Sequence, residues 1–182
     1  MGVVIITGVP GVGKSTVIEA AQKAGDYEVV VYGTEMFNVA MSKGLVKHRD
    51  EMRKLDPNVQ REIQEEAAQA IAAKGDVIVD THCTIQTPRG YLPGIPAWVA
   101  HALKPSQFVL VEATPEEIAG RRAGDATRVR DADSEDAIAQ HQAMNRAAAM
   151  AVATLTGATV ATVINADNKV DETRDQILKI LE

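Results

Sequence analysis

The segment IITGVPGVGKST, residues 5–16, decides how the rest of the chain can be interpreted. Its centre, Gly8–Ser15, fits the pattern G-x-x-x-x-G-K-[ST], with an apolar β-branched run, Val3–Thr7, before it and an amphipathic helical pattern after it. Strand, glycine-rich turn and helix in this order form a phosphate-binding loop. The glycines let backbone N–H groups turn inward around phosphate oxygens, and the helix N-terminus adds a favourable partial charge. The segment therefore predicts a nucleoside triphosphate site.

Two side chains of this loop, and one from a second strand, have distinct predicted roles. Lys14 is expected to reach the β- and γ-phosphates, and Ser15 to offer its hydroxyl to Mg²⁺. The apolar strand Val77–Asp80 ends in a carboxylate, which the sheet would place beside the loop. Asp80 is expected to hold Mg²⁺ directly or through water. The alternative for Asp80 is an aspartate that only caps a loop.

The remaining chain alternates between strand and helix patterns. Further apolar β-branched runs occur at Glu28–Tyr32, Phe108–Glu112 and Thr159–Ile164, and their continuous apolar character favours strands covered on both faces. Helical patterns lie between them, at about 14–24, 35–43, 58–74, 96–103, 115–123, 135–156 and 171–181. The alternation predicts an α/β fold of the P-loop NTPase type. We expect a three-layer sandwich with a five-stranded parallel sheet, helices on both faces, and one domain over residues 1–182.

Composition limits the partners of the chain. A length of 182 residues, 46% hydrophobic and 24% charged, is typical of one soluble globular domain. The net charge of −6 argues against a nucleic-acid partner, and the single cysteine fits a reducing cytoplasm. Residues 147–166 carry no charge and have the length of a membrane span, but Ala and Thr dominate them and Gly157 divides them. We interpret them as a buried helix, turn and strand, and expect no membrane association.

Positive charge is concentrated in one part of this acidic chain. Five of the ten arginines fall within 26 residues, namely Arg121, Arg122, Arg128, Arg130 and Arg146. The segment GDATRVRD, residues 124–131, joins two helical patterns after the fourth strand. In phosphoryl transfer the migrating group carries charge on its equatorial oxygens, which such cations can stabilise.

We interpret residues of about 124–133 as a short lid over the phosphates. Arg128 and Arg130 would close over them, while Arg121 and Arg146 would approach from the two ends of the lid. For Arg122, as for Arg49, Arg61 and Arg174, an exposed surface side chain is the preferred interpretation. A lid of arginines over the phosphates indicates a kinase rather than a GTPase switch.

A GTPase switch is the distant alternative. The segment NKVD, residues 168–171, matches the N-K-x-D pattern of guanine recognition, but only 11 residues follow it and the strand at Asp80 continues as DTHC rather than D-x-x-G. We prefer to interpret residues 168–171 as a polar turn before the last helix. His82 is expected to form a hydrogen bond in the core or site wall, and Cys83 to be a small buried filler.

The segments that carry a family resemblance are GVPGVGKST, YGTEMF, RDEMRKLDP, DTHCTIQTPRGYLPGIP, GDATRVRD and HQAMNRAAA…LTGATV. Through them, the chain resembles the archaeal type of adenylate kinase over essentially its whole length. The resemblance implies the reaction ATP + AMP ⇌ 2 ADP with Mg²⁺, a five-stranded parallel core, a short lid and commonly a homotrimer. The ATP contacts that it implies are Gly8, Val9, Pro10, Gly11, Val12, Gly13, Lys14, Ser15 and Thr16.

The resemblance to the wider adenylate kinases is looser around AMP. Gly33-Thr34 can stand for the T-G-D-x-x-R segment, yet Asn38 occupies roughly the place of its arginine. Within an expected AMP-binding region of about residues 33–74, the candidate ligands are Thr34 and Arg53. Arg89, outside that region, is a further candidate. GYLPGIP, residues 90–96, forms either an irregular wall for the AMP base or a purely structural turn.

A second class of P-loop kinase remains as the alternative. Another nucleoside monophosphate kinase, or a kinase of the shikimate type, would share the loop and the strand order. A hydroxyl acceptor needs a general base, for which Asp80 could serve. An AMP phosphate needs none, since its second pKa of about 6 leaves it anionic at neutral pH.

The lid interpretation predicts the kinetics of its arginine variants. Arg128→Ala or Arg130→Ala should lower kcat by about 10²–10³-fold and not merely raise the KM for ATP, because a water-excluded charged contact of this kind is strongest in the transition state. Arg128→Lys should recover only part of the loss, since an ammonium cannot make the two-pronged contact. Steady-state kinetics with circular dichroism melts would measure this. Arg174→Ala is the silent control, and equally small effects at positions 128 and 174 would contradict the lid.

Overall fold

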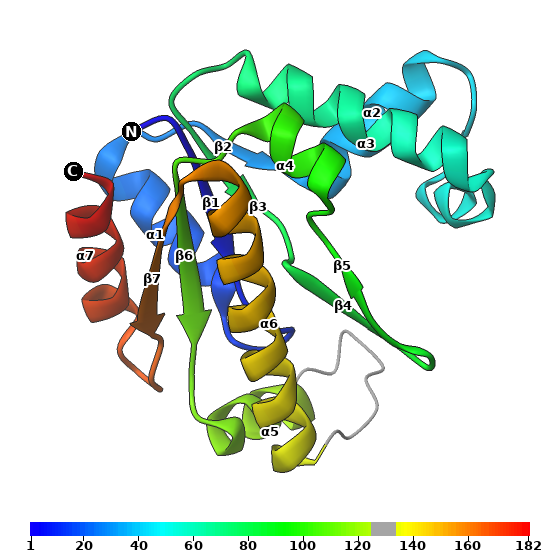
Figure 1. Ribbon diagram of the computed structural model, residues 1–182. Helices are drawn as coiled ribbons and strands as arrows, with labels where there is room; N and C mark the ends of the chain where they lie inside the picture. The colour runs from blue at the N-terminus through cyan, green and yellow to red at the C-terminus, as the bar shows by residue number, and fades with distance from the viewer. Residues whose placement is uncertain (125–133) are drawn as a thin grey trace.

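The protein is described here by a computed structural model, which covers residues 1–124 and 134–182. Its main sheet has five parallel strands in the order β2-β3-β1-β6-β7. The strands are β1 (Val3–Thr7), β2 (Val29–Val31), β3 (Val77–Asp80), β6 (Gln107–Glu112) and β7 (Thr159–Ile164). The predicted five-stranded parallel sheet is therefore confirmed (Figure 1).

Helices cover both faces of this sheet, so the three-layer expectation is also confirmed. In the described residues they are α1 (Lys14–Gly25), α2 (Tyr32–Ser42), α3 (Pro57–Ala72), α4 (Ala97–Leu103), α5 (Pro115–Gly124), α6 (Glu135–Thr156) and α7 (Val170–Leu181), with a 3₁₀ helix η1 (Arg49–Lys54). The predicted helices agree with these to within a few residues. The largest shift is at α2, which begins directly after β2 without an intervening loop.

Alternation along β1 divides the core into two clusters, because successive side chains of a strand point to opposite faces. Val3 and Ile5 pack with α2, α3, α4 and part of α6, whereas Val4 and Ile6 pack with α1, α5 and α7. Every residue of β1 is buried, as expected for a central strand of a parallel sheet. The sheet therefore holds the carboxyl end of β1, where the glycine-rich loop starts, between two packed layers.

One segment differs from the prediction. The residues GYLPGIP were expected to form an irregular loop, but Gly90–Pro93 is a strand, β5, which pairs in antiparallel fashion with β4 (Thr84–Thr87). The hairpin projects from the sheet (Figure 1). Its base is held by α6, where Thr84 lies within hydrogen-bonding distance of Asn145, 3.3 Å, and of His141, 3.2 Å. Asn145 and His141 lie 61 and 57 residues from Thr84 in sequence, so no local pattern indicated this attachment to α6.

The uncharged stretch 147–166 forms the end of α6, a turn and β7, as predicted. Gly157 ends the helix in the left-handed region, with φ of 75°, which a glycine adopts at little cost. Among the described residues no helix has the length and apolar character needed to cross a membrane.

The space around two glycines, Gly94 at the base of the hairpin and Gly120 in α5, predicts opposite effects of their substitution by alanine on stability. A Cβ on Gly94 would lie 1.9 Å from the backbone oxygen of His82, whereas a Cβ on Gly120, inside α5, meets nothing within 4 Å. Gly94→Ala should destabilise the fold by about 1–3 kcal/mol through overpacking. Gly120→Ala should stabilise it by about 0.4–1 kcal/mol through helix propensity and a less flexible unfolded chain. Thermal melts check both, and similar melting temperatures for the two variants would contradict the geometry.

Candidate active site

The phosphate loop (Gly8–Ser15) connects β1 to α1 at the carboxyl edge of the sheet. Gly11 and Gly13 have φ of 88° and 86°, a conformation that side-chain-bearing residues rarely adopt. Gly8 approaches β6 so closely that a Cβ would lie 2.7 Å from the carbonyl oxygen of Val111. The loop therefore has the tight, glycine-dependent conformation that inward-turned amides require.

Lys14 and Asp80 form an ion pair at the centre of this site. The parallel register places Asp80 opposite Ile6, two residues before the loop, so the two strands set the position of the carboxylate. Both side chains are mostly buried, with 10% and 15% of their surface exposed. Burial lowers the pKa of Lys14 to about 8. Lys14 is thus a cation at neutral pH.

His82 and Cys83, which follow β3, have structural contacts. Nδ1 of His82 lies 3.3 Å from the carbonyl oxygen of Gly8. Burial and the nearby Lys14 cation lower the pKa of His82, so its imidazole is neutral at neutral pH. Cys83 is buried, its N–H donates to the Thr7 hydroxyl, and burial raises the pKa of its thiol to about 12. These contacts agree with the roles expected from the sequence.

The donor set fits a magnesium ion that arrives with a nucleotide. No group of three or more His, Cys, Asp or Glu side chains suited to a metal occurs among residues 1–124 and 134–182. Mg²⁺ commonly uses one or two carboxylates together with substrate phosphates and waters rather than an all-protein cage. Asp80 and the hydroxyl of the exposed Ser15 offer that kind of oxygen set beside Lys14.

The structure separates the arginines that the sequence grouped together. Arg121 donates to the carbonyl oxygens of Val12, 3.0 Å, and Asn165, 2.8 Å, and pairs with Asp167 at 2.6 Å. Its guanidinium thus lies on the outer side of the phosphate loop. Arg122 was expected to be an exposed surface side chain, which is wrong: its Nε donates to the carbonyl oxygen of Pro10 at 2.8 Å.

The other arginines of the cluster are differently placed. Arg146 binds the buried Glu112, at the end of β6, through two hydrogen bonds of 2.7 and 2.5 Å. This contact raises the pKa of Arg146. Arg128 and Arg130 lie outside the described residues, as does nearly all of the expected lid. The structure therefore brings Arg121 to the loop and Arg146 to the neighbouring strand end.

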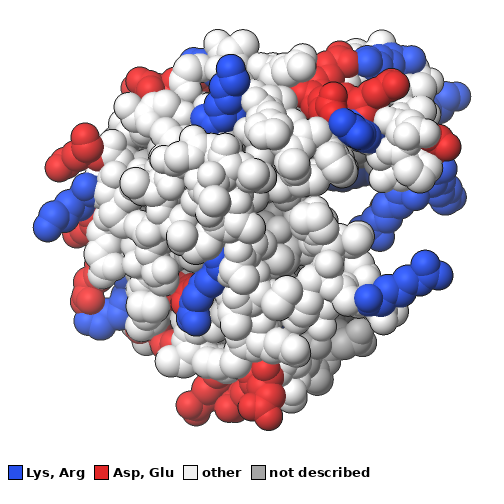
Figure 2. Space-filling view, in the orientation of Figure 1, with Lys and Arg blue, Asp and Glu red and all other residues white. Residues whose placement is uncertain are grey.

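The expected AMP-binding region, about 33–74, comprises α2, η1 and α3. Thr34 lies exposed in the first turn of α2, and Arg53 is exposed on η1. Arg49 comes nearest to that turn, with Nη2 only 2.7 Å from the place of a Cβ on Gly33. Arg89, the only cationic residue of the hairpin, lies at its tip. Figure 2 shows a hollow between the α2–α3 part and the hairpin, with Lys and Arg side chains on both sides.

Sequence reasoning missed two residues of this site. Asn165 follows β7 at the same edge of the sheet and donates to the carbonyl oxygen of Val12 at 2.8 Å. Its place after a predicted strand was a usable signal, since polar residues at carboxyl ends of parallel strands gather at one edge. Arg49 had no such signal, because only folding of η1 against α2 brings it to Gly33.

Comparisons with known proteins identify the family of the chain. A family model for an AAA domain matches residues 7–139. A curated adenylate kinase of Methanothermobacter thermautotrophicus is 51% identical over 185 residues, covering 100% of both chains. That of Methanopyrus kandleri is 54% identical over 94% of each chain, and that of Thermoplasma acidophilum 47% identical over 97% of each.

Solved structures show the same fold in kinases of other substrates. A shikimate kinase of Bacteroides thetaiotaomicron has a TM-score of 0.62 at 12% identity, covering 98% of this chain and 97% of that one. A shikimate kinase of Acinetobacter baumannii, in complex with shikimate, has a TM-score of 0.63 at 14% identity, covering 100% and 93%. At such low identity the likeness concerns the fold alone.

The lowered pKa of Lys14 predicts an alkaline limb in the pH profile. As pH rises through about 8, Lys14 loses its proton and its attraction for phosphate, so kcat/KM for ATP should fall. Lys14→Arg should lack this limb, whatever its absolute activity, because a guanidinium stays charged. A profile of kcat/KM from pH 6 to 10 measures the limb. The same limb in both proteins would mean that another group titrates.

Proposed function

The chain belongs to the archaeal-type adenylate kinases and, over residues 7–139, to the AAA-domain family, and from this membership we propose how its residues divide the reaction between ATP and AMP. The observation that carries the proposal is the Lys14–Asp80 pair at the mouth of a glycine-dependent loop. ATP would place its phosphates in the phosphate loop, with contacts from Gly8 to Thr16. AMP would occupy the hollow between α2, η1 and the hairpin.

In this arrangement, binding of ATP and Mg²⁺ breaks the Lys14–Asp80 ion pair and gives each of the two side chains a new partner. Lys14 would leave Asp80 for the β- and γ-phosphates, and Asp80 and Ser15 would hold Mg²⁺, which supplies charge neutralisation at the phosphate oxygens. Both charges of the pair then keep an opposite charge nearby. A buried ion that lost its partner would be costly, so the exchange also favours binding of the metal and nucleotide together.

The transfer itself needs positioning more than proton chemistry. An oxygen of the AMP phosphate attacks the γ-phosphorus of ATP, the bond from that phosphorus to the bridging oxygen breaks, and two ADP molecules result. The attacking oxygen is already anionic, so no side chain has to remove a proton. The neutral, loop-bound His82 is consistent with this, because it is not arranged as a free base.

For the acceptor phosphate we propose Arg49 together with the earlier candidates Thr34, Arg53 and Arg89. Arg49 has no hydrogen bond or ion pair with another described residue, and it lies against the turn that contains Gly33 and Thr34. Arg89 lies at the tip of the hairpin, which borders the hollow from the other side (Figure 2). A planar guanidinium suits a phosphate because it can donate two parallel hydrogen bonds.

The catalytic arginines remain Arg121, Arg128, Arg130 and Arg146 in this proposal, with a lid over about 124–133. Arg146 is presented at the sheet edge by Glu112, which holds its guanidinium through two bonds. Arg121 already touches the phosphate loop from outside. Charge on the transferred group would be stabilised by those cations that can approach it when ATP is bound.

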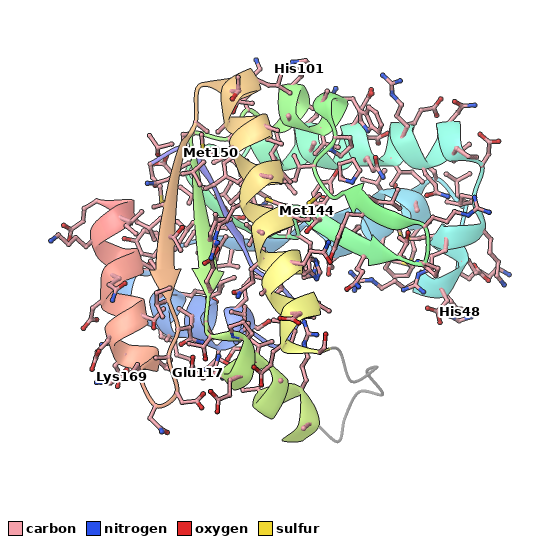
Figure 3. The ribbon with its side chains drawn as sticks, turned by 60° about the horizontal axis from the view of Figure 1, so that its bottom comes forward. His48, His101, Glu117, Met144, Met150 and Lys169 are labelled. Atoms are coloured by element: carbon pink, nitrogen blue, oxygen red, sulfur yellow. The ribbon has the colours of Figure 1, made fainter. Side chains whose placement is uncertain are left out.

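We further propose that the protein is a homo-oligomer, with the trimer implied by the family resemblance, and that it works in the cytoplasm. Helix α6 carries the exposed apolar residues Met144, Met150 and Leu155, 39%, 54% and 54% exposed, and no charged residue between Ala147 and Thr156; Figure 3 labels the two methionines. An uncharged face lets copies of a chain with net charge −6 approach without local repulsion. Sedimentation equilibrium that finds only a monomer would refute the oligomer.

A parallel acceptor assay tests the function. With ATP and Mg²⁺ present, AMP should be phosphorylated far faster than CMP, UMP, GMP or shikimate, as measured by coupled ADP production. In the same assay Arg49→Ala should raise the KM for AMP and leave the KM for ATP unchanged, because the Arg49 site lies on the acceptor side. Arg61→Ala is the matched control, since the Arg61 guanidinium is already engaged by the Trp98 ring and by Glu65. Preference for shikimate would instead support the hydroxyl-acceptor alternative.

A further inference from the structure

Alternate carbonyl oxygens of the phosphate loop are bound by side chains from outside the loop. The carbonyl of Gly8 lies 3.3 Å from Nδ1 of His82, and that of Pro10 accepts from Nε of Arg122 at 2.8 Å. The carbonyl of Val12 accepts from both Asn165, 2.8 Å, and Arg121, 3.0 Å. These partners come from the segment after β3, from α5 and from the segment after β7, so three separate parts of the fold converge on one short loop.

Each of these contacts also orients a backbone amide. In a trans peptide the C=O and the following N–H point in opposite directions from one plane. A carbonyl of Gly8, Pro10 or Val12 that is bound outside the loop therefore directs the N–H of Val9, Gly11 or Gly13 inward. An unbound carbonyl could instead rotate inward and present its negative end to a phosphate. The outside contacts select the orientation that a triphosphate needs.

Asn165 is the most constrained member of this set. Its side chain is buried, with 3% exposed, and its amide is used at both ends: Nδ2 donates to Val12, and Oδ1 accepts from the Thr173 hydroxyl at 3.3 Å. Its backbone N–H donates to the carbonyl of Glu112 at 2.7 Å. Nδ2 lies 2.5 Å from the place of a Cβ on Gly13, so glycine at position 13 permits this close approach.

The neighbouring segment is itself fixed to α5. An oxygen of Glu117 accepts from the N–H of Asp167 at 2.8 Å, and Asp167 pairs with Arg121. Figure 3 shows Glu117 of α5 beside the segment that leads to Lys169 and α7. Helix α5 and the loop after β7 thus hold the phosphate loop as one connected unit.

We propose that Asn165, together with Arg121 and Arg122, acts as a positioning residue for ATP: it holds the Val12–Gly13 peptide with its N–H turned toward the triphosphate. This inference rests on the proposed placement of the ATP phosphates in the loop. It makes a specific kinetic prediction, because the oriented amides serve ATP and not AMP. Loss of the contact should weaken ATP binding and turnover while leaving AMP binding intact.

The test uses Asn165→Asp, which keeps the shape of the side chain and replaces its donor by an acceptor. The substitution leaves the Val12 carbonyl with Arg121 as its remaining side-chain donor and places a carboxylate oxygen against it. The resulting repulsion should raise the KM for ATP by about 10- to 100-fold and lower kcat, with the KM for AMP within twofold of the unaltered enzyme. Asn168→Asp makes the same chemical change three positions along, at an exposed residue, and should leave both constants unchanged. Lys14→Ala is measured in parallel and should abolish turnover if the phosphates occupy the loop.

A second variant keeps the proposal testable if Asn165→Asp does not fold. Arg122→Ala removes the contact to the Pro10 carbonyl, a different carbonyl of the same loop, and should give the same separation of the two KM values, to a smaller degree. Circular dichroism melts confirm folding. Equal rises in both KM values, or an unchanged KM for ATP in the folded variants, would overturn the proposal. If Lys14→Ala remains active, the placement of ATP itself is wrong, whichever result the other variants give.

Discussion

The ion pair between Lys14 and Asp80 is the interaction on which the site depends. Two opposite charges, both mostly buried, are brought together by the register of two adjacent parallel strands, and neither could be left alone at that depth without a large desolvation cost. The pair therefore requires the β1–β3 pairing, and β1 in turn requires a helix layer on each of its faces. Burial that lowers the pKa of Lys14 is a consequence of the same enclosure.

Several basic side chains gather around this pair, and some of them are held by carboxylates. The chain is acidic overall, with net charge −6, yet the edge of the sheet gathers Lys14, Arg121, Arg122 and Arg146. Arg121 and Arg146 each have a carboxylate partner, Asp167 and Glu112, so they are held in place without self-repulsion. A substrate that carries several negative charges can compete for such cations, because it offers more than one oxygen to each.

Much of this could be predicted from the sequence, for a physical reason. The glycine-rich loop and the strand that ends at Asp80 are specified by local residue order, and five apolar runs separated by helical patterns leave few alternatives to a parallel sheet. The hairpin, the contact of Arg122 with Pro10 and the approach of Arg49 to Gly33 could not be predicted. The strands of the hairpin pair locally, with Thr87 opposite Gly90, but its base is attached to α6 only after distant elements pack. The two arginine contacts are also long-range, and the isolated sequence of an exposed arginine looks the same whether or not it finds such a partner.

The fold alone does not decide which group accepts the phosphoryl group; the side chains around the acceptor decide it. Shikimate kinases share this arrangement at 12–14% identity, so a five-stranded sheet with a phosphate loop is compatible with a hydroxyl or a phosphate acceptor. A hydroxyl acceptor and a phosphate acceptor need different side chains around them. A hydroxyl needs a nearby base free to accept a proton, whereas in this structure Asp80 is engaged by Lys14 and His82 is neutral and bound to the loop. A phosphate needs cations on the acceptor side, and Arg49 lies against Gly33 of α2 while Arg89 lies at the tip of the hairpin. Figure 2 shows a hollow between these two parts, with Lys and Arg side chains on both sides. The distribution of bases and cations, rather than the sheet, therefore favours an acceptor that is already anionic.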